Sequence, residues 1–145
     1  MNDMFDGRPL AVPSIPKASK TSGDFVDVML EEEAAKFFEP YASMGEVRYN
    51  VVSAQDIERL IQMFAGAAER AKAAGIDAVE IHAGHGYIFS SFLSPAANQR
   101  TDEYGGSVEN RSRFLTETIK AIRRAVGSDY PVWMRFDSQE FLMDD

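Results

Sequence analysis

The sequence predicts an α/β fold with parallel strands, and two observations support this prediction. Residues 53–74 form an amphipathic helical pattern that leads through Gly75 into a short apolar strand at 78–81. Residues 107–126 repeat the arrangement, since a second helical pattern leads into the apolar segment 132–134. A helix that connects two short apolar strands is the repeating step of parallel α/β sheets.

Composition and charge narrow the classes of function. The chain has 145 residues, enough for one ordinary domain, and 45% of them are hydrophobic, enough for a core. The net charge is −8 and no basic run is longer than a pair of arginines, which argues against nucleic acid and anionic membranes as partners. The absence of cysteine excludes disulfides, thiolate metal sites and an iron–sulfur cluster within these residues.

No targeting or membrane segment is visible in the sequence. The first six residues are acidic and lack the apolar stretch that a signal peptide carries. No apolar run approaches the length that spans a membrane. These features predict a soluble, cytoplasmic protein without a membrane partner, and they leave the oligomeric state open.

Residues 1–52 are predicted to be a largely irregular region that precedes the α/β unit. Prolines and glycines punctuate the first 23 residues, where no periodic apolar pattern is present. A short helix is predicted near 28–39, and Pro40 is expected to end it. Residues 42–52 are predicted to be irregular.

The helix over 53–74 has both start and stop signals. Ser53 is a candidate N-cap, and Asp56 three residues later completes a short-chain version of the capping box. Gly75 is placed to be the C′ residue. Apolar residues at three- and four-residue steps indicate one buried face. This stripe consists of Ile57, Leu60, Ile61, Phe64, Ala68 and Ala71.

The second helix, capped by Ser107, completes a β-loop-α-β unit over residues 77–136. Such a crossover makes its two strands parallel neighbours, which lie about 5 Å apart and end at the same edge of the sheet. His82 follows the first strand and Arg135 ends the second. Both are therefore predicted to face one crevice, in the position where α/β folds bind ligands.

His82 and His85 are the only histidines in the chain. They are three residues apart in a predicted turn, so both rings can point at one ligand atom. Their N–H groups could then hydrogen-bond a carbonyl oxygen and stabilise charge that develops on it. Two histidines that only pack or cap the turn are an equal alternative. Zinc binding through the His-x-x-His spacing is a weaker one, because no third ligand is evident nearby.

Tyr87 and Arg135 extend the candidate site. A phenol can deliver a proton to a developing carbanion, and the position of Tyr87 two residues after His85 favours this role. A lone tyrosine at least as often only covers the rim of a barrel. Arg135 either pairs with a carboxylate or holds an anionic ligand, and for an arginine considered alone the ion pair is favoured.

The polar loop over 94–106 is predicted to have a structural role. Gly105 and Gly106 are a weak signal for phosphate binding, because no further glycines accompany them. Arg100 and Asp102 are expected to brace the loop. The two glycines are expected to permit a tight turn into the following helix.

At this point a family resemblance is visible. Residues 81–114, IHAGHGYIFSSFLSPAANQRTDEYGGSVENRSRF, resemble the fingerprint of the old yellow enzyme family of flavin oxidoreductases, in a branch similar to bacterial NADH:flavin oxidoreductases and 2,4-dienoyl-CoA reductases. The resemblance extends back through 53–74 and forward through 132–145. Residues 10–16, LAVPSIP, resemble the loop after the family's third barrel strand, whereas 24–50 depart from the family pattern.

The resemblance implies a (β/α)₈ TIM barrel with FMN at the carboxyl ends of its strands. It implies that NAD(P)H reduces the flavin, and that reduced flavin gives a hydride to the β-carbon of an activated alkene, such as an enone or enoyl substrate. His82 and His85 would bind and polarise the substrate carbonyl, and Tyr87 would protonate the α-carbon. Arg135 would lie beside the N1–C2=O edge of the flavin. No metal ligand is implied.

A full barrel needs about 250 residues, so the chain holds only part of one. Residues 53–145 are expected to be its central part, comprising one complete β-loop-α-β unit and a preceding helix. A 4Fe-4S cluster of the dienoyl-CoA reductase branch would lie downstream. The chain is therefore expected to be a fragment that is inactive alone. The alternatives are a non-catalytic truncated remnant and, less favoured, a metal-dependent barrel enzyme that uses His82 and His85.

Overall fold

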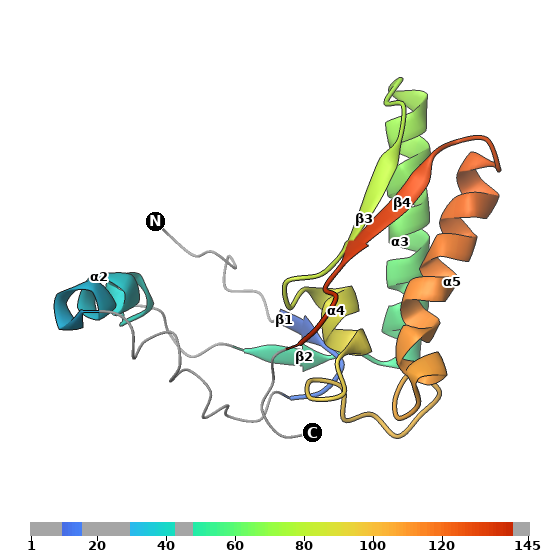
Figure 1. Ribbon diagram of the computed structural model, residues 1–145. Helices are drawn as coiled ribbons and strands as arrows, with labels where there is room; N and C mark the ends of the chain where they lie inside the picture. The colour runs from blue at the N-terminus through green and yellow to red at the C-terminus, as the bar shows by residue number, and fades with distance from the viewer. Residues whose placement is uncertain (1–9, 16–29, 43–47, 141–145) are drawn as a thin grey trace.

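The computed structural model describes residues 10–15, 30–42 and 48–140. In chain order the elements are β1 (Leu10–Val12), α2 (Glu31–Ala42), β2 (Tyr49–Val51), α3 (Ala54–Ala73), β3 (Val79–Ala83), α4 (Ile88–Leu93), α5 (Val108–Val126) and β4 (Val132–Phe136) (Figure 1). The predicted mixture of helices and parallel strands is confirmed. No helix in this described part of the chain is long and apolar enough to cross a bilayer.

The strands form two separate parallel pairs. β1 pairs with β2, and β3 pairs with β4. In the second pair His82 is the register partner of Arg135, and Glu80 is the partner of Trp133. The chain leaves β3, passes through α4 and α5, and returns in β4, as the predicted crossover requires. Within the described residues neither sheet closes into a barrel.

Both long helices begin and end where the sequence predicts. The Ser53 hydroxyl accepts a hydrogen bond from the N–H of Asp56 (3.1 Å), and the Asp56 carboxylate accepts one from the N–H of Ser53 (3.0 Å), which completes the capping box of α3. The hydrogen bonds from Ser53 lower the pKa of the Asp56 carboxyl. Ser107 caps α5 through the N–H of Asn110 (3.3 Å).

The core lies between α3, α5 and one face of the β3–β4 pair. Along β3, Ile81 and Ala83 are buried in this core, whereas Glu80 is exposed and His82 is half-buried. Alternate residues of a strand point to opposite faces, so Glu80 and His82 lie on the face that the helices leave open. Figure 1 shows α3 and α5 running side by side along the strand pair. The fold therefore holds polar residues of β3 outside the core.

Two predictions about this region need correction. The first strand was predicted to end at Ile81, but β3 continues through His82 and Ala83, because both residues pair with β4 and Ala83 is buried. No helix was predicted between Tyr87 and the loop that starts at Ser94, but the six-residue helix α4 lies there. Its aromatic side chains are buried, with Phe89 4.7 Å and Phe92 5.0 Å from Phe114 between ring centroids.

The prediction of an irregular region over 1–52 is also incomplete. The structure has the short strands β1 and β2 there, whose pairing joins segments that are far apart in sequence. The helix predicted near 28–39 corresponds to α2, which continues past Pro40 to Ala42. Residues 28 and 29, like most of the first 29 residues, lie outside the described part of the chain.

Candidate active site

The four candidate site residues come together at the carboxyl ends of β3 and β4. His82 is the penultimate residue of β3, and His85 lies in the turn that follows. Tyr87 directly precedes α4 as its N-cap residue. Arg135 lies beside His82 in the strand register. The predicted convergence at one edge of the sheet is therefore present, although His82 is in the strand and not in the turn.

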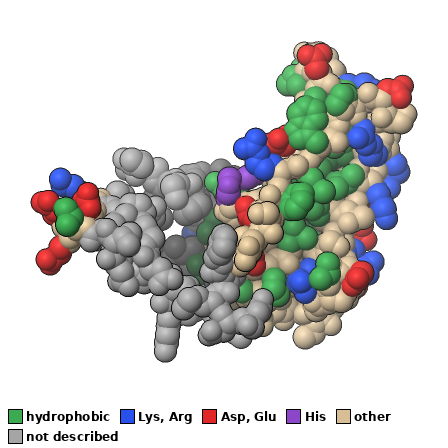
Figure 2. All heavy atoms as spheres, in the orientation of Figure 1, with side chains coloured by type: hydrophobic (Ala, Val, Ile, Leu, Met, Phe, Trp, Pro, Cys, Tyr) green, Lys and Arg blue, Asp and Glu red, His purple; other side chains and the backbone are tan. Residues whose placement is uncertain are grey.

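The aromatic rings of this group are neighbours. The ring centroids of His82 and His85 are 4.9 Å apart, and those of His82 and Tyr87 are 5.2 Å apart. No described residue hydrogen-bonds to a ring nitrogen of either histidine or to the Tyr87 hydroxyl. Tyr87 is 63% exposed, and Figure 2 shows the histidine side chains at the surface. Their polar atoms are thus free to bind a ligand.

The turn that carries His85 has an unusual backbone. His85 has a φ of +58° and Gly86 one of +73°, in the left-handed region that only glycine adopts easily. The Ser91 hydroxyl donates to the Gly86 carbonyl oxygen (2.8 Å) from within the first turn of α4. Asp137, for which the sequence predicts no role, accepts a hydrogen bond from the backbone N–H of His85 (2.9 Å).

Arg135 forms an ion pair on the open face of the sheet. Its Nε lies 3.2 Å from Oε1 of Glu80, and the other carboxylate oxygen of Glu80 accepts a hydrogen bond from Nε1 of Trp133 (2.8 Å). The Arg135 side chain is nevertheless 65% exposed, and its two terminal nitrogens have no partner among the described residues. Because a guanidinium has five N–H donors, Arg135 can pair with Glu80 and still bind an anionic ligand.

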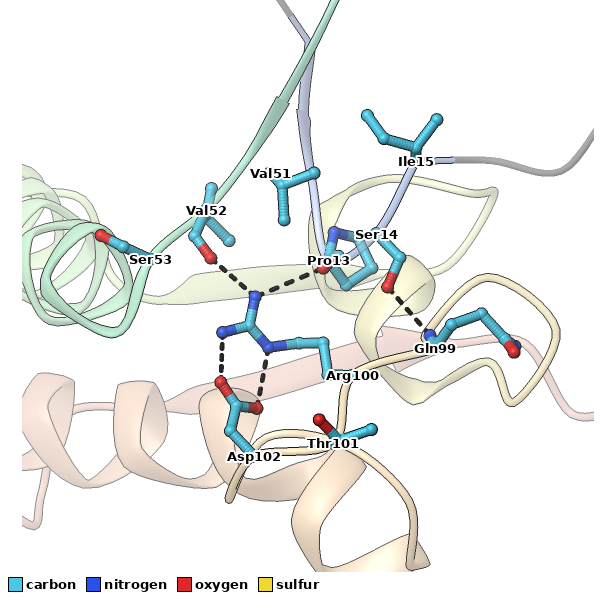
Figure 3. Close-up of a pocket in the computed structure, with 10 residues that line it drawn as sticks. All are labelled: Pro13, Ser14, Ile15, Val51, Val52, Ser53, Gln99, Arg100, Thr101 and Asp102. Carbon is cyan, nitrogen blue, oxygen red and sulfur yellow. Dashed lines mark hydrogen bonds and ion pairs between the residues drawn. The ribbon is translucent and has the colours of Figure 1, made fainter.

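A second polar group, around Arg100, lies in an open hollow of about 500 Å³. The hollow is lined by Pro13, Ser14, Ile15, Val51, Val52, Ser53, Gln99, Arg100, Thr101 and Asp102 (Figure 3). The Arg100 guanidinium donates twice to the Asp102 carboxylate (2.9 and 2.5 Å) and to the carbonyl oxygens of Val52 (2.6 Å) and Pro13 (3.3 Å). With four of its donors occupied, Arg100 joins three chain segments and is not an anion site.

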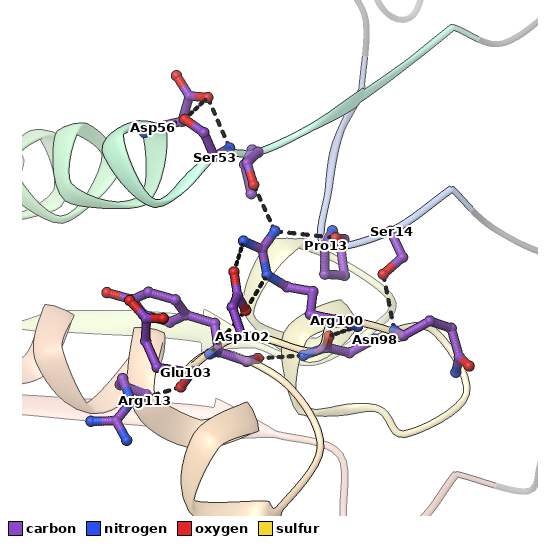
Figure 4. A network of polar contacts seen from close by, with 12 residues as sticks. Pro13, Ser14, Ser53, Asp56, Asn98, Arg100, Asp102, Glu103 and Arg113 are labelled. Carbon is purple, nitrogen blue, oxygen red and sulfur yellow. Dashed lines mark hydrogen bonds and ion pairs between the residues drawn. The ribbon is translucent and has the colours of Figure 1, made fainter.

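The rest of this network fixes the loop between α4 and α5 (Figure 4). The buried Asn98 amide donates to the carbonyl oxygens of Phe92 (2.7 Å) and Tyr104 (2.8 Å), and its oxygen accepts from the N–H of Arg100 (3.1 Å). The hydrogen bonds from Arg100 lower the pKa of the Asp102 carboxyl. The predicted bracing role of Arg100 and Asp102 is confirmed, whereas the central position of Asn98 was not foreseen.

Zinc sites in proteins use three or four protein ligands. No group of three histidine, cysteine, aspartate or glutamate side chains suited to a metal ion is present in residues 10–15, 30–42 and 48–140.

Comparison with known proteins places the chain in a family. The family model described as the NADH:flavin oxidoreductase / NADH oxidase family matches residues 19–145. The chain belongs to this family. The resemblance seen in the sequence is therefore confirmed, and the family is one of oxidoreductases that use a flavin and a nicotinamide reductant.

The relatives share this region at substantial identity. The chain is 51% identical over 87 residues to an NADH oxidase of Thermoanaerobacter brockii, covering 60% of this chain and 13% of the relative. It is 48% identical over 90 residues to an NADPH dehydrogenase of Bacillus subtilis, covering 62% of this chain and 26% of the relative. It is 39% identical over 136 residues to a metal reductase of Desulforamulus reducens, covering 94% of this chain and 17% of the relative.

A solved structure supports the same placement. A 2-naphthoyl-CoA reductase in complex with 2-naphthoyl-CoA matches with a TM-score of 0.59 and 46% identity, over 60% of this chain and 13% of that one. The chain thus spans between 13% and 26% of the length of these relatives.

Proposed function

We propose that this protein is an FMN-dependent ene-reductase of the old yellow enzyme type, which oxidises NAD(P)H and reduces the C=C bond of an activated alkene. The observation that carries the proposal is the cluster of His82, His85 and Tyr87 at the carboxyl end of β3, with Arg135 beside it on β4. Membership of a flavin oxidoreductase family supports the choice of cofactor.

Arg135 is the residue that we propose for flavin binding. Its terminal guanidinium nitrogens are exposed and lack a partner among the described residues. They are therefore available to hydrogen-bond the anionic edge of a ligand. Bound FMN would supply the hydride that it has taken from NAD(P)H. A positive charge at Arg135 would stabilise the negative charge that a reduced flavin carries at its N1–C2=O edge.

His82 and His85 are proposed to bind the carbonyl oxygen of the substrate. Two imidazole N–H donors on one oxygen withdraw electrons from the conjugated C=C bond and stabilise the enolate charge that follows hydride addition at the β-carbon. The Tyr87 hydroxyl then gives its proton to the α-carbon and regains one from solvent. Hydride and proton together make a two-electron reduction, which balances the oxidation of one NAD(P)H.

We also propose that the described unit is part of a (β/α)₈ barrel. Two parallel strands that are joined by a helical crossover, with the helices on one face of the strand pair, are the repeating geometry of that fold. Met134 and Phe136 on β4 are 43% and 58% exposed, as expected where further barrel elements cover them. On this proposal the 145 residues alone bind FMN weakly and do not turn over. Stoichiometric FMN on this purified chain would contradict that expectation.

The Tyr87→Phe variant of the protein at its full natural length tests the proposed reaction. Flavin reduction by NAD(P)H should be retained, because it needs no proton from Tyr87. Reoxidation by 2-cyclohexenone should slow by roughly 10²–10⁴-fold, since the α-carbon loses its proton donor. Stopped-flow absorbance of the flavin measures the two half-reactions separately.

Tyr49→Phe is the matched control for this experiment. Tyr49 is a partly exposed tyrosine on β2, outside the histidine turn, and its variant should behave as the parent in both half-reactions. An unchanged rate with 2-cyclohexenone in Tyr87→Phe would remove Tyr87 from the proposed role.

A further inference from the structure

Asp137 follows β4 directly and reaches across to the turn between β3 and α4. Its Oδ2 accepts hydrogen bonds from the backbone N–H of His85 (2.9 Å) and from the hydroxyl of Ser90 (3.3 Å). The Ser90 oxygen in turn accepts one from the backbone N–H of Gly86 (3.1 Å). One carboxylate therefore holds two consecutive N–H groups of the turn, one directly and the other through the buried Ser90.

This turn adopts a conformation that needs support from outside. A left-handed φ is unfavourable for a residue with a side chain, and His85 has a φ of +58°. The other hydrogen bonds of the turn are local, such as that from the Tyr87 N–H to the Gly84 carbonyl oxygen (3.3 Å). The contact with Asp137 joins residues that are 52 positions apart in the sequence. Asp137 thus ties the turn to the neighbouring strand.

The approach of Asp137 depends on a glycine. A Cβ atom added at Gly84 would lie 2.8 Å from Oδ1 of Asp137, closer than such atoms approach in proteins. Gly84 is buried, so the carboxylate packs directly against the backbone of the turn. The obstructing atom belongs to the end of a side chain, so Gly84→Ala should displace the carboxylate without preventing the chain from folding.

We infer that Asp137 is a positioning residue of the proposed active site. It lies two residues after Arg135, and by holding the His85 turn it fixes His85 and Tyr87 relative to Arg135. In the proposed function these groups bind the substrate, deliver the proton and bind the flavin, so their relative placement sets the geometry of the reaction. The inference rests on that proposed function, but the attachment of the turn to Asp137 can be measured independently of it.

The experiment compares Asp137→Ala, Asp137→Asn and Gly84→Ala with the parent holoenzyme at its full natural length. Hydrogen–deuterium exchange of the peptide that covers residues 84–91 reports on the turn without any need for activity. Steady-state kinetics with NADPH and 2-cyclohexenone report on the site, with KM and kcat determined separately. Asp129→Ala is the control, because Asp129 is an exposed carboxylate that precedes β4 at its opposite end.

Asp137→Ala and Gly84→Ala are expected to exchange roughly 10-fold faster in this peptide and to raise the KM for the enone by about 10-fold or more, with flavin content retained. Asp137→Asn keeps one acceptor oxygen and should recover part of the loss. Asp129→Ala should match the parent in both measurements.

Two results would overturn the inference. Unchanged exchange in Asp137→Ala means that the carboxylate does not hold the turn. Faster exchange with parental KM and kcat means that the turn is held but that its position does not matter for the reaction. A parent holoenzyme that fails to reduce the enone would instead refute the proposed function, and the role of Asp137 in that reaction with it.

Discussion

Glu80 and Arg135 form an ion pair across the β3–β4 pair, on the face that α3 and α5 leave open. Their nearest atoms, Oε1 and Nε, are 3.2 Å apart, and both side chains retain substantial exposure to solvent. The second carboxylate oxygen of Glu80 binds the indole N–H of Trp133. Glu80 therefore orients two side chains of β4 and leaves the outer donors of Arg135 available.

The Glu80→Gln variant separates the structural and the electrostatic effect of this ion pair. An exposed pair contributes little to folding, so the free energy of unfolding should change by less than about 1 kcal/mol. If Arg135 lies beside the flavin as proposed, removal of the nearby negative charge should stabilise the reduced flavin. The midpoint potential should rise by roughly 10–30 mV, equivalent to about 0.5–1.4 kcal/mol for two electrons.

Potentiometric titration of the holoenzyme measures this shift. Glu58→Gln is a suitable control, since Glu58 is an exposed carboxylate on α3 that contacts Gln62. A potential in Glu80→Gln that equals that of the parent, or lies below it, would place Arg135 away from the flavin.

Substitution of Arg100 is expected to affect folding stability, because its side chain is only 9% exposed and its N–H donors bind other groups of the protein. Arg100→Ala leaves the carbonyl oxygens of Val52 and Pro13 without a donor and should lower the free energy of unfolding by about 2–4 kcal/mol. Arg100→Lys should recover little of this, since an ammonium cannot reach a carboxylate in bidentate fashion and two carbonyls together.

Chemical denaturation monitored by the single tryptophan, Trp133, provides the measurement. Arg124→Ala on the exposed side of α5 is the matched control and should change stability by less than about 0.5 kcal/mol. A loss in Arg100→Ala no larger than that of the control would show that the bracing network contributes nothing to stability.

The parts of the fold that the sequence predicts are those with local signals. Ser53 and Asp56 form a capping box within four residues, and the crossover rule places His82 next to Arg135 without knowledge of any other strand. Helix α4 was missed because six residues are too few for a periodic pattern. Its existence depends on the packing of Phe89 and Phe92 against Phe114, which is distant in sequence.

The candidate site likewise has features with a local sequence signal and features that depend on contacts between distant residues. The types and spacing of His82, His85 and Tyr87 are a local signal in the sequence that points to a candidate site. Asp137 supports the His85 turn through a hydrogen bond to a backbone N–H that is 52 residues away in the sequence. A contact of this kind cannot be predicted from the types of the two residues. The pairing of Arg135 with Glu80 depends on strand register, which assigns both side chains to the same face.

Alanine substitutions at Gly105 and Gly75 are expected to separate the cost of a steric clash from the cost of a left-handed backbone conformation. A Cβ atom there would lie 2.2 Å from the carbonyl oxygen of Arg100, which is backbone and cannot move aside easily. Gly105→Ala should therefore lower the free energy of unfolding by about 2–4 kcal/mol. In Gly75→Ala the added Cβ meets nothing within 4 Å, and only the φ of +80° opposes it, so that loss should be about 1–2 kcal/mol.

Thermal or denaturant unfolding of the two glycine variants, measured side by side, provides the comparison. Equal losses would mean that the loop relaxes around the new methyl group. In that case the close approach of Gly105 to Arg100 does not restrict this position.

Ionisation of Tyr104 is expected to make the stability of the folded protein depend on pH in the alkaline range. Burial, together with the hydrogen bond that its hydroxyl donates to Glu117 (3.0 Å), raises its pKa from 10.0 to about 12. Between these two values the unfolded chain has lost the phenolic proton and the folded protein has kept it. The folded state then binds more protons, so the free energy of unfolding falls as pH rises. The contribution is complete below pH 10 and is lost by about pH 12.

Two variants test this dependence through denaturant unfolding at several values between pH 9 and pH 12. The difference in stability between the parent and Tyr104→Phe should shrink by roughly 1–3 kcal/mol across that interval, because phenylalanine has no proton to lose. Glu117→Gln keeps an acceptor oxygen but removes the charge, so its own decline should be smaller than that of the parent. Parallel pH profiles for the parent and Tyr104→Phe would show that Tyr104 ionises alike in the folded and unfolded states, and that its burial beside Glu117 does not affect stability through this proton.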